Sequence, residues 1–307
     1  MTELEPIDVI MCTWNSNKPY FRKCLRSIKR EVDLHHLIVI DRYSTDQTLE
    51  VVRNVFPDVK IFQTDVNLAC ARGIGIANVD TRYFAFIDDD IEVSEGWFTE
   101  LISFIKGGKQ VGAVQGFVRL YVDYLNKAMM FELSRRKGHA KEVTARGYTN
   151  NTLLVTEIVR DLNLPPSVHS WEDFLITQHV IKKGYKWFET DQAQVTNYGD
   201  ADASYFAELR RYFLRGKWHG AGDRLVHIHS SSFVRDIAHL LLSSFKNILY
   251  ASTITIAVSD PRILLIRFFG QSGYLAGFLY ANNNIVPYKL HMARSQIGAV
   301  QTRGERT

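Results

Sequence analysis

The feature that most constrains the fold is a series of short apolar runs, each separated from the next by a stretch with helical spacing. The runs lie at residues 7–12, 37–40, 60–62 and 83–87, and the helical stretches lie at 20–30, 48–55 and 69–78. This alternation is typical of a mostly parallel sheet flanked by helices. A chain of 307 residues is long enough for one large domain or two ordinary ones. We therefore predict an α/β fold for the first part of the chain.

The second half of the chain has a different pattern. Further strands are expected at residues 111–117 and near 152–155, followed by a helix at 171–183, whereas residues 118–150 have no decisive pattern. From residue 204 onward the chain reads as helices. We therefore expect an α/β domain over residues 1–200, with any ligand site at its sheet, and a helical C-terminal region over residues 201–307.

Three adjacent carboxylates, Asp88, Asp89 and Asp90, follow the apolar run at 83–87. Because neighbouring carboxylates repel one another, a positive group among them would favour the arrangement. Mg²⁺ and Mn²⁺ are hard cations that bind a few carboxylates together with phosphate oxygens. The triplet therefore predicts a metal–diphosphate site, and a solvated acidic turn is the alternative.

Polar residues also follow the first two runs, at the end of a parallel sheet where ligands bind. Thr13, Trp14 and Asn15 follow the first run, and Asp41 begins a Ser/Thr/Asp cluster after the second. Asp41 can accept a hydrogen bond from a nucleobase, and an aromatic ring can stack on the base. The alternative is ordinary turn and helix-capping chemistry.

Two further segments carry charged candidates. Arg72 lies near the start of the helical stretch that precedes the acidic run, and its planar guanidinium can pair with diphosphate oxygens. Glu172 and Asp173 open the helix expected at 171–183, where one of them can act as a general base. A surface arginine and acidic residues that favour the helix dipole are the respective alternatives.

In this order, the segments resemble glycosyltransferase family 2, whose fold is the Rossmann-like GT-A fold. The resemblance covers about residues 7–190. The matching positions are Thr13-Trp14-Asn15, Asp41 to Asp46, Asn67 with Ala71, Arg72 and Gly75, Asp88 to Asp90, and the Glu172-Asp173 pair.

The resemblance implies roles at the donor site. Asp41 would read the nucleobase of a nucleotide diphosphate sugar, with Thr13 and Asn15 lining the nucleoside pocket. Arg72 would hold the base or the phosphates of the donor.

The resemblance also implies the chemical step. Asp88 and Asp90 would flank the ribose and a divalent Mg²⁺ or Mn²⁺ ion, with Asp89 close by. Asp173, beside Glu172, would deprotonate an acceptor hydroxyl, and in-line displacement of the nucleotide would invert the anomeric carbon.

The sequence departs from the family pattern at two places. Arg42 and Tyr43 follow Asp41 where the family usually has Asp or Asn and then Gly or Ser, which leaves the nucleotide undefined. Many members also carry a metal-holding histidine after the base helix, whereas residues 195–200 contain none. His219 is the nearest substitute.

Charge is divided unevenly along the chain. Residues 203–307 contain 13 Lys/Arg against 5 Asp/Glu, a net of +8, whereas the first 202 residues have a net of −4. The apolar stretches at 235–258 and 263–281 are interrupted by polar residues and do not cleanly meet the roughly 20-residue requirement of a spanning helix. We therefore expect peripheral contact with an anionic membrane surface, or a homo-oligomer interface, with a plain helical cap as the alternative.

Location and rival functions follow from what the sequence lacks. Three unpaired cysteines and an N-terminus without a signal-like pattern fit the cytoplasm, at the cytoplasmic face of a membrane. The expected acceptor is a hydroxyl of a glycan or lipid-linked glycan, with polyprenyl phosphate as the runner-up. A nucleotidyltransferase would need a Gly-rich basic loop after the first strand, and no nucleic-acid recognition motif is present. A catalytically decayed sugar-nucleotide-binding module is the other rival.

Overall fold

The fold is taken from a computed structural model, which describes residues 5–164, 166, 171–199, 204–227 and 233–280. The chain divides into two compact units. The first comprises Met1–Leu164 and Glu172–Ala201, and the second comprises Pro165–Trp171 and Asp202–Thr307. That these units carry the separate functions expected of residues 1–200 and 201–307 stays a prediction.

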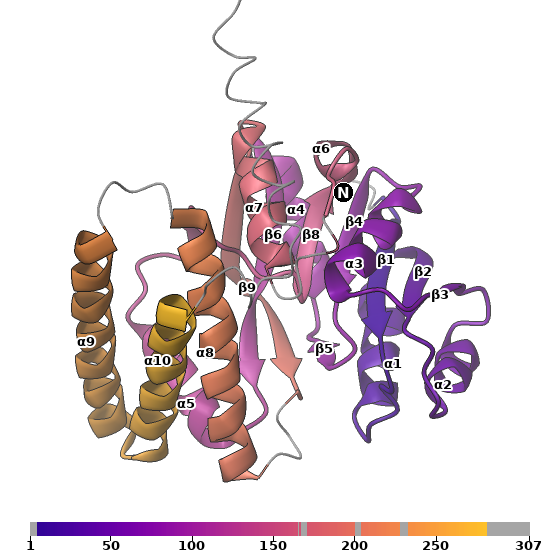
Figure 1. Ribbon diagram of the computed structural model, residues 1–307. Helices are drawn as coiled ribbons and strands as arrows, with labels where there is room; N and C mark the ends of the chain where they lie inside the picture. Colours follow the sequence, from indigo (N-terminus) through magenta and orange to yellow (C-terminus); the bar gives the residue numbers. More distant parts are fainter. Residues whose placement is uncertain (1–4, 165, 167–170, 200–203, 228–232, 281–307) are drawn as a thin grey trace, which may run out of the picture. The chain divides into compact units, whose positions relative to one another are not determined.

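A nine-stranded sheet forms the centre of the first unit, in the order β3-β2-β1-β4-β8-β6-β9-β5, with β7 paired to β9 (Figure 1). The strands are β1 (Ile7–Thr13), β2 (Leu34–Asp41), β3 (Lys60–Gln63), β4 (Tyr83–Ile87), β5 (Ile91–Val93), β6 (Val111–Leu120), β7 (Ala140–Glu142), β8 (Asn151–Val155) and β9 (Lys186–Asn197). β1 to β4 are mutually parallel along the order β3-β2-β1-β4, and β8 is antiparallel to both of its neighbours. The α/β class predicted from the sequence is confirmed, with a mixed sheet.

The helices of the first unit pack against this sheet. They are α1 (Phe21–Glu31), α2 (Thr48–Val55), α3 (Leu68–Ala77), α4 (Trp97–Gly107), α5 (Asp123–Ser134), α6 (Thr156–Val159) and α7 (Glu172–Lys182). α3 contacts β1 and β2, whereas α4 contacts β6 and β9. On β1, Ile10 and Met11 point to opposite faces and both are buried. Burial on both faces explains why the strands read as continuous apolar runs rather than as alternating ones.

The second unit contains three long helices, α8 (Tyr205–His227), α9 (Phe233–Val258) and α10 (Arg262–Tyr280). α8 and α10 approach so closely that a Cβ atom on Gly220 would lie 1.9 Å from the Tyr274 carbonyl oxygen, and one on Gly277 would lie 1.9 Å from that of Lys217. Glycine is therefore required at these two contacts, because a side chain would force the backbones apart. The helical character expected of the C-terminal region is confirmed for residues 205–227, 233–258 and 262–280, and the rest of the prediction lies largely outside the described residues.

α9 differs from the sequence-based expectation that no stretch could cleanly span a membrane. In the described part of the chain, Leu240–Val258 has a mean hydropathy of 1.3 and is long and apolar enough to do so, by length and composition alone. The window carries one charged residue, Lys246, because it begins after the polar residues of the first turn. Its exposed side chains include Leu241, Leu242, Phe245, Leu249 and Ile256.

Candidate active site

Three parallel strands place polar residues at one edge of the sheet, which we call the carboxyl edge. β1 ends at Thr13 and β2 ends at Asp41, and these two residues are register partners. β4 ends at Ile87, directly before Asp88. Because the strands run in the same direction, the residues that follow them lie along the same edge, where open α/β sheets bind ligands.

Asp41 is completely buried below this edge. Its carboxylate accepts hydrogen bonds from the Thr13 hydroxyl (2.9 Å), from the Ser44 amide (2.9 Å) and hydroxyl (2.5 Å), and from Gln63 Nε2 (3.1 Å). These donors compensate for the burial of a charged group. Direct contact between Asp41 and a nucleobase therefore requires one of the donors to move aside, and base reading by Asp41 stays a prediction.

Asn15 organises the loop after β2. Its side-chain oxygen accepts hydrogen bonds from the backbone amides of Thr45 (2.8 Å) and Asp46 (3.4 Å). The backbone amide of Asn15 donates to Ser44 Oγ at 2.8 Å. The residue has a φ of 50°, in the left-handed region that Asn tolerates better than most residues. Asn15 is absent from the cavity lining formed by the described residues, and its role in a nucleoside pocket stays a prediction.

A cavity of about 280 Å³ opens at the carboxyl edge. Its lining includes Cys12, Thr13, Trp14, Arg42 and Asp89. Trp14 is 63% exposed, and the Arg42 guanidinium carbon lies 5.1 Å from the centre of its ring. Burial raises the pKa of the Cys12 thiol to about 12, so this side chain is neutral near pH 7. The cavity therefore combines an accessible aromatic surface with a carboxylate.

Arg72 is buried on α3 and connects three segments. Its Nη2 donates to Asp88 Oδ1 at 3.1 Å, its Nη1 donates to the Thr149 carbonyl at 3.2 Å, and its Nε lies 3.5 Å from Glu172 Oε1. Burial works against the charged guanidinium, but Asp88 and Glu172 outweigh it and raise the pKa of Arg72. Arg72 thus stays positive and joins the acidic triplet to the helix that begins at Glu172.

The two acidic residues at the start of α7 are both buried and have different partners. Asp173 Oδ2 accepts from Arg146 Nε at 2.9 Å and lies 2.8 Å from Arg146 Nη2, while Oδ1 accepts from the Phe174 amide at 2.8 Å. Glu172 Oε2 is buried and has no hydrogen-bond partner among the residues that the structure describes. Burial raises the pKa of both carboxyls, opposed by Arg72 at Glu172 and by Arg146 at Asp173.

The three carboxylates of the triplet point to three different partners. Asp88 pairs with Arg72, Asp89 accepts a short hydrogen bond from the Ser16 hydroxyl, and Asp90 Oδ1 accepts from Asn197 Nδ2 at 3.4 Å. Burial raises the pKa of Asp89 to about 6, and the Ser16 hydrogen bond opposes this rise. The triplet is therefore spread across the carboxyl edge rather than gathered at one point.

The donor chemistry of the triplet fits Mg²⁺ or Mn²⁺, because both prefer carboxylate oxygens. Within the described residues, these oxygens do not form a group of three ligand atoms within 4.8 Å of one another. Mg²⁺ needs only one or two carboxylates when phosphates and water complete its shell. Metal binding by Asp88 and Asp90 therefore stays a prediction.

Several residues at this edge are not indicated as site residues by the sequence patterns. Ser16, Gln63 and Asn197 touch predicted site residues, and Arg146 holds Asp173. Ser16 directly follows the Thr13-Trp14-Asn15 segment, so its place after β1 is a usable signal. Arg146 lies in the stretch 118–150, which has no pattern that would indicate its partner.

Comparisons with known proteins identify glycosyltransferases that are similar to part of this chain. Residues 8–153 match the model of glycosyl transferase family 2. The chain is 36% identical over 72 residues to the SPbeta prophage-derived glycosyltransferase SunS of Bacillus subtilis, which covers 22% of this chain and 17% of that protein. It is 32% identical over 92 residues to the teichoic acid poly(glycerol phosphate) polymerase of Staphylococcus epidermidis, over 28% of this chain and 13% of that protein. The chain thus spans less than a fifth of the length of these two relatives.

A shorter relative and a solved structure extend the comparison. An uncharacterized glycosyltransferase of Haemophilus influenzae is 28% identical over 104 residues, which is 32% of this chain and 42% of that protein. The crystal structure of residues 1–349 of Staphylococcus aureus TarS superposes with a TM-score of 0.49 at 16% identity, over 90% of both chains.

Proposed function

We propose, from the match of residues 8–153 to the glycosyl transferase family 2 model, that the protein is an inverting, metal-dependent glycosyltransferase. It moves a sugar from a nucleotide diphosphate sugar to a hydroxyl of a glycan or lipid-linked glycan. The observation that supports this most directly is the chain of charges at the carboxyl edge. There buried Arg72 joins Asp88, beside the cavity-lining Asp89, to Glu172.

The cavity is the proposed donor site. Trp14 offers an exposed ring on which a base can stack, and Thr13 lines the same space. Asp41 lies behind Thr13 and orients its hydroxyl through their 2.9 Å hydrogen bond. Arg72 provides a positive charge toward the diphosphate without leaving its buried position.

Asp88 and Asp90 are the proposed metal ligands, and Asp89 the neighbouring carboxylate. A divalent cation held there would neutralise charge on the departing nucleotide diphosphate. Gly199 leaves room for the Asp90 carboxylate, because a Cβ atom at position 199 would lie 2.4 Å from Asp90 Oδ2.

Asp173 is the proposed general base for the acceptor hydroxyl. Its Oδ2 is held by Arg146, which fixes the carboxylate in position, and burial raises its pKa toward the range where a base works at neutral pH. Glu172 is the second candidate, favoured by its buried Oε2, to which no other described residue donates a hydrogen bond.

Two amide variants separate these candidates. We expect Asp173→Asn to lower kcat by about 10²–10⁴-fold, the usual contribution of a general base, while Glu172→Gln retains far more activity. The reverse order would assign the base to Glu172. An unchanged rate in both would favour polyprenyl phosphate as acceptor, because that acceptor is already an anion. Thermal unfolding of each variant controls for loss of structure.

The donor itself is tested by thermal shift with UDP-, GDP-, CDP- and dTDP-sugars, with and without Mn²⁺. We expect one nucleotide class to stabilise the protein only with the metal, and Asp90→Ala to abolish that shift. Asp123→Ala, an exposed carboxylate paired with Lys127, is the matched control and should keep the shift. No shift with any donor would favour a catalytically decayed module.

For the C-terminal helices we propose peripheral contact with the cytoplasmic face of a membrane. The support is the net charge of +8 over residues 203–307 and the row of exposed apolar side chains on α9. The test is flotation with liposomes with and without anionic lipid, followed by alkaline carbonate extraction. Carbonate-resistant protein would instead indicate that Leu240–Val258 spans the bilayer, and absence of binding to either liposome would leave these helices as an oligomer interface or a cap.

A further inference from the structure

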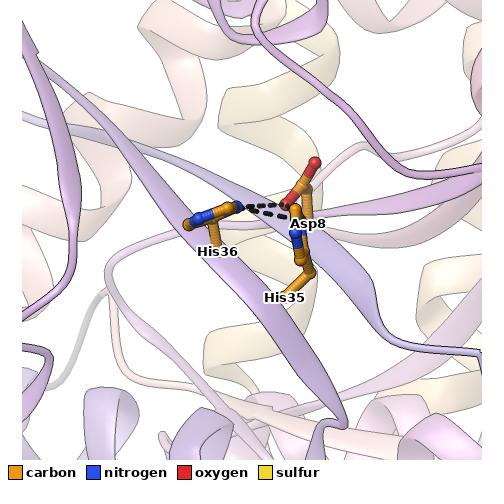
Figure 2. Close-up of side chains that lie close together, drawn as sticks. All are labelled: Asp8, His35 and His36. Carbon is orange, nitrogen blue, oxygen red and sulfur yellow. Dashed lines mark hydrogen bonds and ion pairs between the residues drawn. The ribbon is translucent and has the colours of Figure 1, made fainter.

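Three potential metal-ligating side chains meet at the end of the sheet opposite the carboxyl edge. Asp8 belongs to β1, and His35 and His36 belong to β2 (Figure 2). Asp8 Oδ1 lies 2.9 Å from His35 Nδ1 and 3.5 Å from His36 Nδ1, and the two Nδ1 atoms lie 2.8 Å apart. We refer to these residues as the Asp8–His35–His36 cluster.

Two adjacent histidines on a regular strand would point to opposite faces of the sheet. Here the register between β1 and β2 shifts, because Ile7 pairs with Leu34 whereas Val9 pairs with Leu37. Two residues of β2, His35 and His36, therefore stand opposite the single residue Asp8. This is a β-bulge, which is rare in a parallel pair and is a known means of redirecting a side chain. The bulge explains why both imidazoles reach the same carboxylate.

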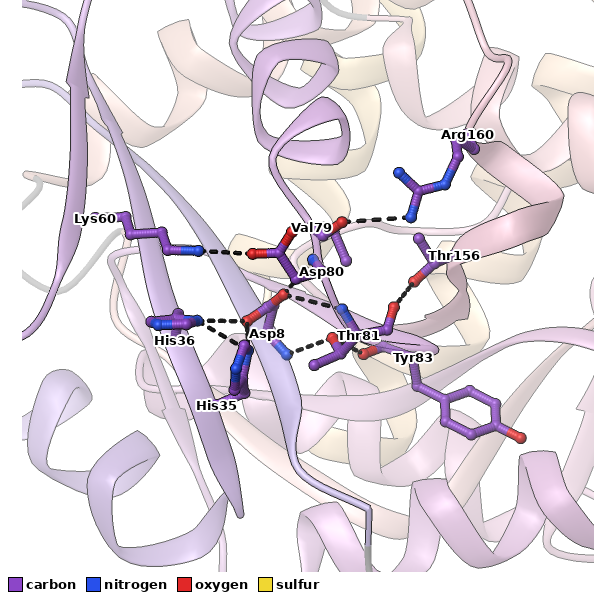
Figure 3. Close-up of polar contacts among 10 residues, drawn as sticks. All are labelled: Asp8, His35, His36, Lys60, Val79, Asp80, Thr81, Tyr83, Thr156 and Arg160. Carbon is purple, nitrogen blue, oxygen red and sulfur yellow. Dashed lines mark hydrogen bonds and ion pairs between the residues drawn. The ribbon is translucent and has the colours of Figure 1, made fainter.

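The carboxylate of Asp8 is held in place from its other side (Figure 3). Asp8 is completely buried, and its Oδ2 accepts from the Asp80 amide at 2.7 Å and from the Thr81 amide at 3.3 Å. The Asp8 amide in turn donates to Thr81 Oγ1 at 2.9 Å. These contacts occupy Oδ2 and leave Oδ1 directed at the histidines. Such outer hydrogen bonds orient ligands in metal sites.

The distances within the cluster suit a cation. The circle through the three ligand atoms has a radius of about 1.8 Å, which is shorter than the ~2.0–2.1 Å of a Zn–N bond. A cation about 1 Å out of their plane would thus lie at bonding distance from all three. Without a bound cation, only one of the two facing Nδ1 atoms can carry a proton that forms a hydrogen bond between them, since two N–H groups cannot donate to each other.

The donor types select the class of cation. Imidazole nitrogen suits Zn²⁺, Cu²⁺, Ni²⁺ and Co²⁺, whereas Mg²⁺ requires oxygen. The side chains of His35 and His36 are 41% and 29% exposed, so water can complete the coordination shell. Asp8 and Thr13 are separated by five residues of β1, or about 17 Å at ~3.3 Å per residue. The cluster is therefore separate from the donor site.

We propose that Asp8, His35 and His36 form a binding site for a late first-row divalent cation, with Zn²⁺ as the preferred ion, that ties β1 to β2 at the amino end of the sheet. This role is independent of the proposed transferase chemistry. Together with the metal site of the proposed function, on which this statement rests, the domain would bind two cations of different chemistry, an oxygen-preferring ion at the carboxyl edge and a nitrogen-preferring ion at the opposite edge.

The test is Zn²⁺ titration of the whole, tag-free protein by calorimetry in the presence of excess Mg²⁺, which occupies oxygen sites. We expect His35→Gln and His36→Gln each to weaken one Zn²⁺ site by at least tenfold, and the double variant to lose one equivalent of bound Zn²⁺. His139→Gln is the matched control, because His139 also pairs with a carboxylate, Asp191, at 3.0 Å but belongs to no group of three potential ligands among the described residues. The control should titrate like the wild type.

Co²⁺ gives a second readout, since ligation by imidazole produces visible d–d absorption that depends on the ligands. The wild-type band should disappear in the double variant and persist in Asp90→Ala. Thermal unfolding without metal verifies that the histidine variants are folded. Equal Zn²⁺ affinity and stoichiometry in the wild type and the double variant would overturn the proposal, as would a Co²⁺ band that is lost in Asp90→Ala and retained in the double variant.

Discussion

Arg72→Leu is the substitution whose effect can be worked out most fully from the structure. The side chains of Arg72 and Glu172 are only 4% and 7% exposed, and Leu would leave the Glu172 charge buried without its partner. Breaking a buried ion pair from one side costs about 3–5 kcal/mol. Asp88 is about one-third exposed, so the loss of its contact adds little because solvent screens it.

The loss is measurable by urea and thermal unfolding at pH 8. With a change in Tm of about 2–4 °C per kcal/mol in a unit of this size, we expect Tm to fall by roughly 6–20 °C. The total stability of a domain is about 5–15 kcal/mol, so the variant can still fold at low temperature. Arg42→Leu is the control, since Arg42 forms an exposed ion pair with Asp65 and its loss should cost about 0–1 kcal/mol.

The stability loss caused by Arg72→Leu should depend on pH with a defined sign. Burial raises the pKa of Glu172, and removal of Arg72 raises it further, so the folded variant prefers a protonated Glu172. The contribution of Glu172 to the stability of the variant is therefore largest in acid and is lost as the pH rises through the folded-state pKa of this carboxyl. The deficit relative to the wild type should be smaller at pH 5 than at pH 8, and Arg72→Leu with Glu172→Gln should recover part of it. A deficit below about 1 kcal/mol at pH 8, or one that grows in acid, would refute the reasoning.

Three further substitutions test single contacts. Trp14→Ala removes the exposed ring of the cavity. Because base stacking contributes ~1–3 kcal/mol, the affinity for the nucleotide sugar measured by calorimetry should fall by about tenfold or more, and an unchanged affinity would exclude stacking on Trp14. Gly199→Ala introduces a Cβ atom 2.4 Å from Asp90 Oδ2. The Mn²⁺-dependent thermal shift should become smaller, while the Tm without metal stays near that of the wild type. An unaltered shift would count against Asp90 as a metal ligand. Gly220→Ala places a Cβ 1.9 Å from the Tyr274 carbonyl and should lower the Tm of the C-terminal unit by several degrees, whereas a wild-type Tm would show that α8 and α10 separate easily.

Much of the fold of the first unit can be predicted from local sequence. The runs at 7–12, 37–40 and 83–87 became β1, β2 and β4 because strands buried on both faces are apolar throughout. The run at 60–62 became β3, a partly exposed strand at the end of the sheet. The start of α3 is likewise local, since the Asn67 side chain accepts from the Cys70 amide and caps the helix. β7 and β9 were missed, because their polar residues pair with distant segments and have no distinctive pattern of their own.

The candidate site shows the same limit. That Thr13, Asp41 and Asp88 share one edge follows from strand direction and can be predicted. That Asp41 would be enclosed by four hydrogen bonds, and that Asn15 would hold a loop, depends on partners that only the folded chain brings within reach.

The sequence by itself determined which residues form strands and at which ends of them the polar groups stand, since both follow from hydrophobic pattern and chain direction. Only the tertiary structure decided which of those groups meet. Arg72 lies 100 positions from Glu172 in the chain, and no local rule pairs them. His35 and His36 should face opposite ways by strand periodicity, and a bulge against β1 turns both toward Asp8. Contacts of this kind depend on register between strands, which is set by the packing of the whole sheet.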